Sequence, residues 1–148
     1  MTGFLIFVFI GSFLWALLEI QIEGDAGWAA SLPCWRVEHH ILLDIFYGGR
    51  PLTGYHLWAF SFVFLCFHMP FFCGIAWTVG KECSTLAGYA LFWTIEDFLW
   101  FAFNPHFGLK KFNRHFVWWH RRWLAGLPLD YFILLGGAFA LLAVGQRI

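Results

Sequence analysis

Charged residues are scarce in this sequence. Asp, Glu, Lys and Arg make up 12% of its 148 residues, whereas soluble domains carry about 25%. Nine basic and nine acidic residues cancel, so there is no excess of positive charge that would predict binding to nucleic acid. The remainder is strongly apolar, with 61% hydrophobic and 23% aromatic residues. These values predict a membrane protein with a single domain.

Several familiar sequence signals are missing as well. The four cysteines, Cys34, Cys66, Cys73 and Cys83, form no CxxC pair and no disulfide-rich spacing, so we expect reduced thiols. The first residues lack a basic region and a small-residue cleavage site, and we therefore expect no signal peptide. Internal repeats and low-complexity segments are also absent from the sequence.

Four apolar stretches are long enough to cross a membrane as helices. They cover residues 3–20, 55–79, 84–103 and 129–145. A span needs about 20 residues, and a helix satisfies its own backbone hydrogen bonds in lipid. The predicted fold is an all-α integral membrane protein with four transmembrane helices in one domain.

The basic residues of the connections predict the orientation of these helices. Residues 21–54 and 104–130 contain seven Lys and Arg residues, whereas the other side has only Lys81 and Arg147. Because basic residues favour the cytoplasmic side, we expect both connections in the cytoplasm and both termini outside. The protein would then be a multi-pass protein of the cell membrane.

Each of the two connections contains a segment that mixes apolar and polar residues. These segments are residues 31–46, for which Ser31 is the predicted N-cap, and residues 107–128. Both are expected to lie at the headgroup level as interfacial segments on the cytoplasmic side.

The predicted orientation gathers the ionisable residues on one side of the membrane. Six of the seven histidines and eight of the nine acidic residues are expected there. Glu96 and Asp97 interrupt the apolar stretch FWTIEDFLWF, and a charged Asp inside a span costs about 2.5–3.5 kcal/mol on insertion scales. Adjacent helical residues point about 100° apart, so we expect Glu96 to face Glu19 and His56. Asp97 is expected to meet Arg114 or backbone donors near the interface.

Two interpretations of the acidic pair remain open. In one, an acid pairs with an arginine or hydrogen-bonds across the bundle and only fixes helix packing. In the other, the acids belong to an acid–base or metal site, because carboxylates and imidazoles from different helices suit Fe, Mn or Zn. The candidate catalytic residues are Glu96, Asp97, Glu19 and His56, and the candidate metal ligands are Glu19, Glu23, His56, Glu96, His106, His115 and His120.

The stretch RHFVWWHRRW, residues 114–123, is suited to a membrane surface. Arg121 and Arg122 could bind a lipid phosphate while Trp118 and Trp119 anchor in the interface. Simple anchoring of the topology would use the same residues. Membrane lipid is therefore the expected partner, and a homo-oligomer or a larger membrane complex is a further possibility.

Two families share features with this sequence. The seven residues IEDFLWF resemble the acidic pair with aromatics of the small membrane carotenoid (lycopene) cyclase domains, without the proline that usually precedes that pair. The histidine-rich side resembles that of membrane fatty-acid hydroxylases and desaturases, without their HxxHH-type boxes. Neither resemblance assigns a role to a residue of this chain.

Three classes of function fit these features. The first is a small membrane enzyme that acts on a lipid or isoprenoid at the cytoplasmic face. The second is a non-catalytic subunit of a larger membrane complex, and the third is a proton or metal-ion carrier. A carrier needs polar groups along its whole path, whereas the outer half holds little beyond His68 and Thr78. The sequence therefore favours the enzyme.

Overall fold

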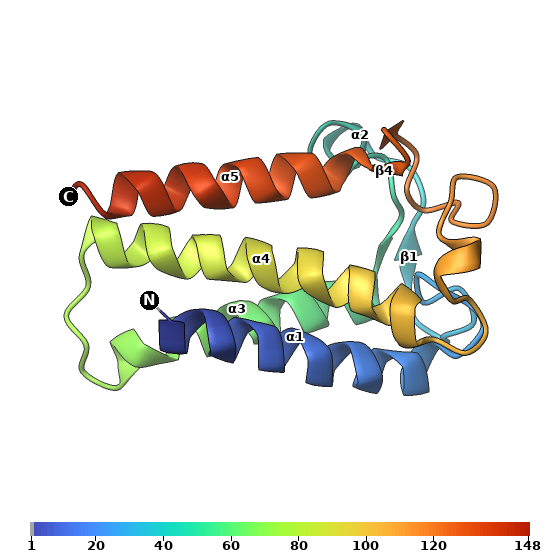
Figure 1. Ribbon diagram of the computed structural model, residues 1–148. Helices are drawn as coiled ribbons and strands as arrows, with labels where there is room; N and C mark the ends of the chain where they lie inside the picture. The colour runs from blue at the N-terminus through green and yellow to red at the C-terminus, as the bar shows by residue number, and fades with distance from the viewer. Residues whose placement is uncertain (1) are drawn as a thin grey trace.

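Four long helices dominate the structure, a computed structural model that describes residues 2–148. They are α1 (Thr2–Glu23), α3 (Gly54–Phe72), α4 (Val79–Phe103) and α5 (Leu129–Gly145). In Figure 1 they run alongside one another, with the α3–α4 turn at one end and both long connections at the other. α4 is central, since it packs against α1, α3 and α5. The chain is mostly helical, as the sequence predicts.

Two of the four helices meet the length and composition expected of a membrane span. These are α1 and α3. α5 is apolar but has 17 residues, and the 25 residues of α4 include Lys81, Glu82, Glu96 and Asp97. The prediction of four spans is thus supported for two helices by this criterion.

The helices differ in extent from the second and third predicted spans. α3 ends at Phe72 rather than at residue 79, because Gly74 turns the chain in the left-handed conformation, with φ at 95°. α4 begins at Val79 rather than at residue 84, because Thr78 accepts the Lys81 N–H at 3.2 Å as an N-cap.

The first connection, between α1 and α3, also differs from the prediction. Its helix α2 (Ile41–Phe46) is capped by His40 instead of starting near Ser31. Two short strands flank this helix, β1 (Arg36–Val37) and β2 (Leu52–Thr53), and they pair antiparallel. This pairing returns the chain to the end of α1 immediately before α3 begins.

The second connection, between α4 and α5, folds back against the ends of the helices. It contains the 3₁₀ turn η1 (Leu109–Lys111) and the antiparallel strands β3 (Trp123–Leu124) and β4 (Leu127–Pro128). Trp119 stacks on Phe101 of α4, with ring centroids 5.8 Å apart and planes 9° apart. The connection is therefore a packed cap on one end of the bundle.

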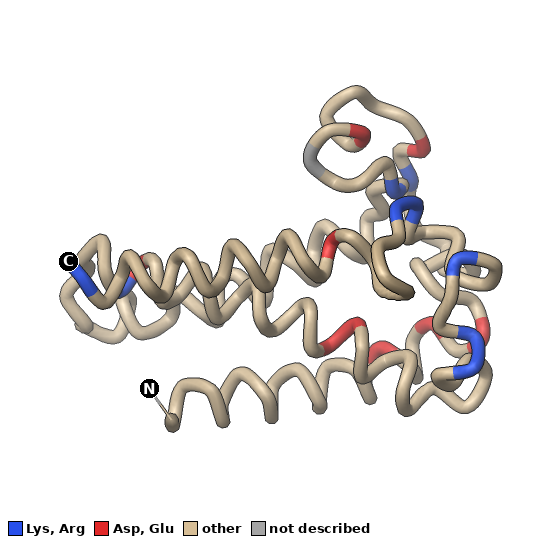
Figure 2. The backbone as a smooth tube through the Cα atoms, turned by 45° about the horizontal axis from the view of Figure 1, so that its top comes forward, with Lys and Arg blue, Asp and Glu red and all other residues tan. Residues whose placement is uncertain are grey.

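The apolar core has two parts. The first fills the middle of the helices and contains Val8, Val63, Phe67, Ala87, Leu91, Phe92 and Ala138. The second joins the connections to the helix ends and contains Ala16, Ile20, Trp28, Trp100, Phe101, Val117 and Trp119. In Figure 2 most of the charged residues lie toward the end of the molecule that holds the two long connections.

Candidate functional site

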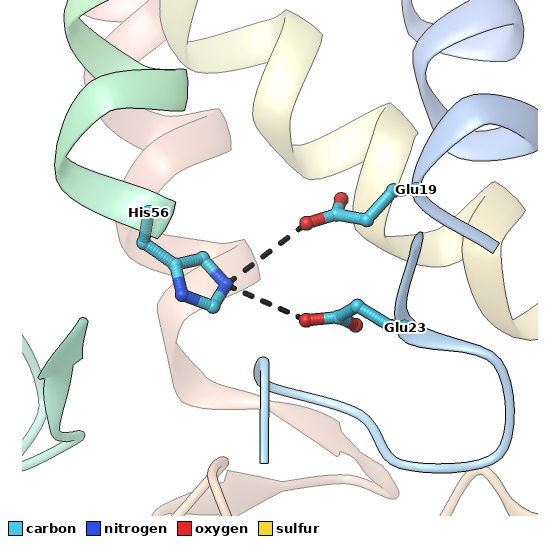
Figure 3. A group of neighbouring side chains, drawn as sticks. All are labelled: Glu19, Glu23 and His56. Carbon is cyan, nitrogen blue, oxygen red and sulfur yellow. Dashed lines mark ion pairs between the residues drawn. The ribbon is translucent and has the colours of Figure 1, made fainter. Parts of the chain in front are cut away.

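A buried group of acids and one histidine lies where the second part of the core meets α1 and α3. Glu19 and Glu23 come from the last two turns of α1, and His56 comes from the first turn of α3. His56 Nε2 lies 4.0 Å from Glu19 Oε1 and 3.9 Å from Glu23 Oε1. Figure 3 shows both carboxylates directed toward this nitrogen. These distances are too long for hydrogen bonds, so the three groups face one another across a small gap.

The orientation of His56 is fixed on two sides. Thr53 Oγ1 accepts the His56 backbone N–H at 3.2 Å and lies 2.7 Å from Nδ1. Trp28 stacks on the imidazole, with centroids 4.0 Å apart and planes 20° apart. A proton on Nδ1 would donate to Thr53 and leave the Nε2 lone pair facing the two glutamates.

The turn after α1 positions Glu23. The backbone N–H of Ala29 donates to Glu23 Oε1. Trp28 and Ala29 both adopt positive φ, at 59° and 50°, a conformation that costs energy in residues other than glycine. Arg36 offsets this cost because its guanidinium donates to the carbonyls of Trp28 and Ala29.

Glu96 completes the acidic group from α4. Its exposed fraction is 3%, its carboxyl group lies within hydrogen-bonding reach of that of Glu19, and the charges of Glu19 and Glu23 repel it. Glu96 Oε1 has no hydrogen-bond partner within residues 2–148. A buried polar atom of this kind calls for an explanation, since most buried polar atoms in proteins are hydrogen-bonded.

Asp97 belongs to a second hydrogen-bonded network. Its Oδ2 lies 3.1 Å from His120 Nε2 and accepts a hydrogen bond from the Tyr131 hydroxyl. His120 Nδ1 lies 3.4 Å from Asp130 Oδ2, and Asp130 in turn accepts from Arg50. The sequence predicts a contact between Asp97 and Arg114 as one possibility. The structure does not show it, because Arg114 is exposed.

The charges around His120 set its protonation. Burial alone would lower the pKa of His120, but the Asp97 carboxylate and the hydrogen bonds to Asp130 and Asp97 outweigh burial. The pKa is therefore raised above its ordinary value of 6.5. The positive form of His120 ties α4, the second connection and the start of α5 together.

Both networks line one cavity of about 530 Å³. Its lining includes five acids, Glu19, Glu23, Glu96, Asp97 and Asp130, two histidines, His56 and His120, and two arginines, Arg50 and Arg122. Ile45 and Ile133 also line it, although 63% and 62% of their surfaces are exposed. The cavity therefore opens to the outside beside α2 and α5, between apolar side chains.

The structure brings together some of the residues predicted for the site and separates others. Glu19, Glu23, His56 and Glu96 form one group, and Asp97 and His120 lie in the network beside it. His106 and His115 are exposed and outside the cavity lining. The seven predicted metal ligands thus do not form a single site.

The predicted lipid-headgroup residues also separate. Arg121, Arg122 and Trp118 are exposed, which leaves them accessible to a membrane surface. Trp119 is buried, with 3% of its surface exposed, so its prediction as an interfacial anchor is wrong. Its ring packs on α4 because the connection folds back on the bundle.

Sequence reasoning missed Arg50, Asp130 and Tyr131. Asp130 and Arg50 are 80 positions apart, and only the folded connections bring them together. One signal was available, because Asp130 is an acidic residue at the start of an apolar stretch. An acidic residue at the end of a membrane span needs a partner. Arg50 and Asp130 are both predicted on the cytoplasmic side of the membrane, so Arg50 was a candidate partner.

Comparisons with known proteins place this chain in no family. No protein-family model matches it, and neither does any curated protein or solved structure. The function must therefore be inferred from the geometry of the cavity and its side chains.

Proposed function

We propose that the protein is a small integral membrane enzyme whose carboxylate–histidine site acts on a lipid or isoprenoid. The observation that carries this proposal is the two-sided character of the cavity. Its interior holds acidic and histidine side chains, whereas exposed Ile45 and Ile133 border its opening. Such a cavity suits an amphiphile whose polar group enters while its apolar chain stays in the bilayer.

The surface of the helices supports a position in the membrane. Large apolar side chains are exposed along α1, α3 and α5, among them Ile6, Phe9, Phe62, Leu65, Ile133 and Phe139. Soluble monomers rarely expose apolar surface on this scale. The 17 residues of α5 extend about 26 Å at 1.5 Å per residue, close to the thickness of the hydrocarbon layer.

The acidic residues of α4 are compatible with a position of this helix across the membrane. Glu96 is buried inside the bundle, and Asp97 is paired with His120. Glu82 lies in the first turn of the helix, where it pairs with His68 at 3.1 Å. Charged residues in spans usually face the interior or a partner in this way. By the distribution of basic residues, the connections would lie in the cytoplasm and both termini outside.

Acid–base chemistry is the reaction type that the lining favours. Five acids outnumber two arginines there, so the polar group of the substrate should be a hydroxyl or an amine rather than a phosphate. Glu96 and the Asp97–His120 pair could exchange protons with such a group.

The carrier alternative is less well supported. Between the cavity and the His68–Glu82 pair, α3 and α4 contribute Val63, Phe67, Ala87, Leu91 and Phe92 to the apolar core. A proton or ion would have to cross this apolar layer, where none of these side chains offers it a ligand.

Lipid turnover in a reconstituted bilayer tests the proposal. The full chain is placed in nanodiscs that contain phospholipids and an isoprenoid alcohol, and the lipids are followed by mass spectrometry. We expect conversion by the wild type and by the control Glu82→Gln, and a loss of about 100-fold or more in Glu96→Gln. An unchanged lipid pool with folded wild-type protein would reject the enzyme and favour the non-catalytic subunit.

A further inference from the structure

We propose that Glu19, Glu23 and His56 bind one divalent transition-metal ion in the cavity, beside Glu96. The inference deepens the proposed function by naming the group that the cavity would hold beside its substrate. It can be measured without any substrate, so the two proposals can fail separately.

The spacing of the three groups fits an ion placed between them. A zinc ion lies about 2.0–2.2 Å from nitrogen and carboxylate oxygen ligands in a tetrahedral site, so its ligand atoms lie about 3.3–3.6 Å apart. His56 Nε2 lies 4.0 Å from the Glu19 oxygen and 3.9 Å from the Glu23 oxygen. All three ligand atoms lie within 4.8 Å of one another. Only a small closure of the two glutamates is then needed.

Glu96 gives an independent indication of a ligand. Its side chain is 3% exposed, and within residues 2–148 its Oε1 has no hydrogen-bond donor. Three carboxylates in one buried group repel one another unless a cation or protons offset their charge. A dication held by Glu19, Glu23 and His56 would offset the negative charge around Glu96.

The surroundings of His56 and Glu23 resemble those of metal ligands in one respect. Imidazole ligands usually donate their second ring N–H to a nearby oxygen, which fixes the tautomer and the ring plane. Thr53 Oγ1 is in that position, 2.7 Å from Nδ1. The Ala29 backbone N–H also fixes Glu23, but it donates to Oε1, the same oxygen that faces His56 Nε2. The second lone pair of this oxygen would therefore bind the ion.

The neighbouring Asp97–His120 network is a less suitable metal site. Both nitrogens of His120 already face carboxylate oxygens, and Arg50 supplies a permanent positive charge to Asp130. A metal would have to displace these contacts. We therefore assign the ion to the Glu19–Glu23–His56 group alone, with Fe, Mn and Zn as the metals that carboxylate and imidazole ligands suit.

Metal binding by the full chain in detergent micelles tests this assignment. The protein is stripped with a chelator, loaded separately with Mn(II), Zn(II) or anaerobic Fe(II), and analysed for bound metal. We expect about one ion per chain for at least one metal, and at least a tenfold loss of affinity in His56→Gln and Glu23→Gln. The controls His68→Gln and Glu82→Gln change a Glu–His pair at the other end of the bundle and should bind as the wild type does.

A second pair of variants and a spectrum keep the test decisive if a ligand variant misfolds. Thr53→Val should weaken binding about 10- to 100-fold while Thr53→Ser restores it. X-ray absorption of the loaded wild type should show one imidazole with oxygen ligands and no sulfur. Less than a tenth of an ion per chain with all three metals, unchanged binding in folded His56→Gln, or a sulfur-containing shell would overturn the assignment. Stoichiometric metal without lipid turnover would reject the proposed function and leave this site standing.

Discussion

Asp97 Oδ2 lies 3.1 Å from His120 Nε2, although the two residues are 23 positions apart in the chain. The neighbouring acid, Glu96, is instead buried beside Glu19 and Glu23 with one oxygen unpartnered. The two adjacent carboxylates therefore differ: Asp97 meets a histidine and a tyrosine hydroxyl, whereas Glu96 lies among other acids.

The first prediction separates the roles of these two acids. Asp97→Asn should lower the free energy of unfolding by about 1–3 kcal/mol, because it weakens buried contacts to His120 and Tyr131. Glu96→Gln should cost little stability, since it removes charge from a group of like charges. Denaturant titration in detergent measures both, and equal losses in the two variants would disprove the division.

The second prediction concerns pH. Because the folded-state pKa of His120 is raised above 6.5, its positive form stabilises the fold fully at low pH and this contribution is lost as pH rises through the folded value. The stability difference between wild type and His120→Gln should therefore be largest near pH 6 and shrink towards alkaline pH. A difference that grows with pH would show that His120 is neutral in the folded protein.

The third prediction concerns orientation. Single cysteines at Asn113 and Ala76, in a background without the natural cysteines, should label from opposite sides of the membrane, with Asn113 inside. Ala76 is preferable to Gly80, because a side chain at Gly80 would meet the Gly145 carbonyl oxygen at 2.8 Å. Labelling of both positions from the same side would contradict the four-span topology.

The fourth prediction tests α5 as a span. Phe139 is 64% exposed near the middle of this helix. If that face contacts lipid, Phe139→Arg should impair membrane insertion by about 2.5–3.5 kcal/mol on insertion scales. In a water-exposed helix the same change would have almost no effect, so normal insertion of the variant would count against the span.

The sequence predicted the helices and part of the site for a simple physical reason. Consecutive membrane spans run antiparallel, so the end of one lies on the same side as the start of the next, and this predicts that Glu19 and His56 meet Glu96. The connections could not be predicted in this way. Their course depends on the positive φ of Trp28 and Ala29 and on the burial of Trp119, and no periodic pattern signals these features.

Native mass spectrometry of protein released from bilayers shows whether the cavity binds an amphiphile. Ala90 lines the cavity from α4, so Ala90→Trp should fill it without changing any charge. We predict that the wild type and Glu82→Gln retain one lipid or isoprenoid, while folded Ala90→Trp loses it. Equal retention by Ala90→Trp would contradict binding in the cavity, because the amphiphile would then be bound elsewhere on the surface.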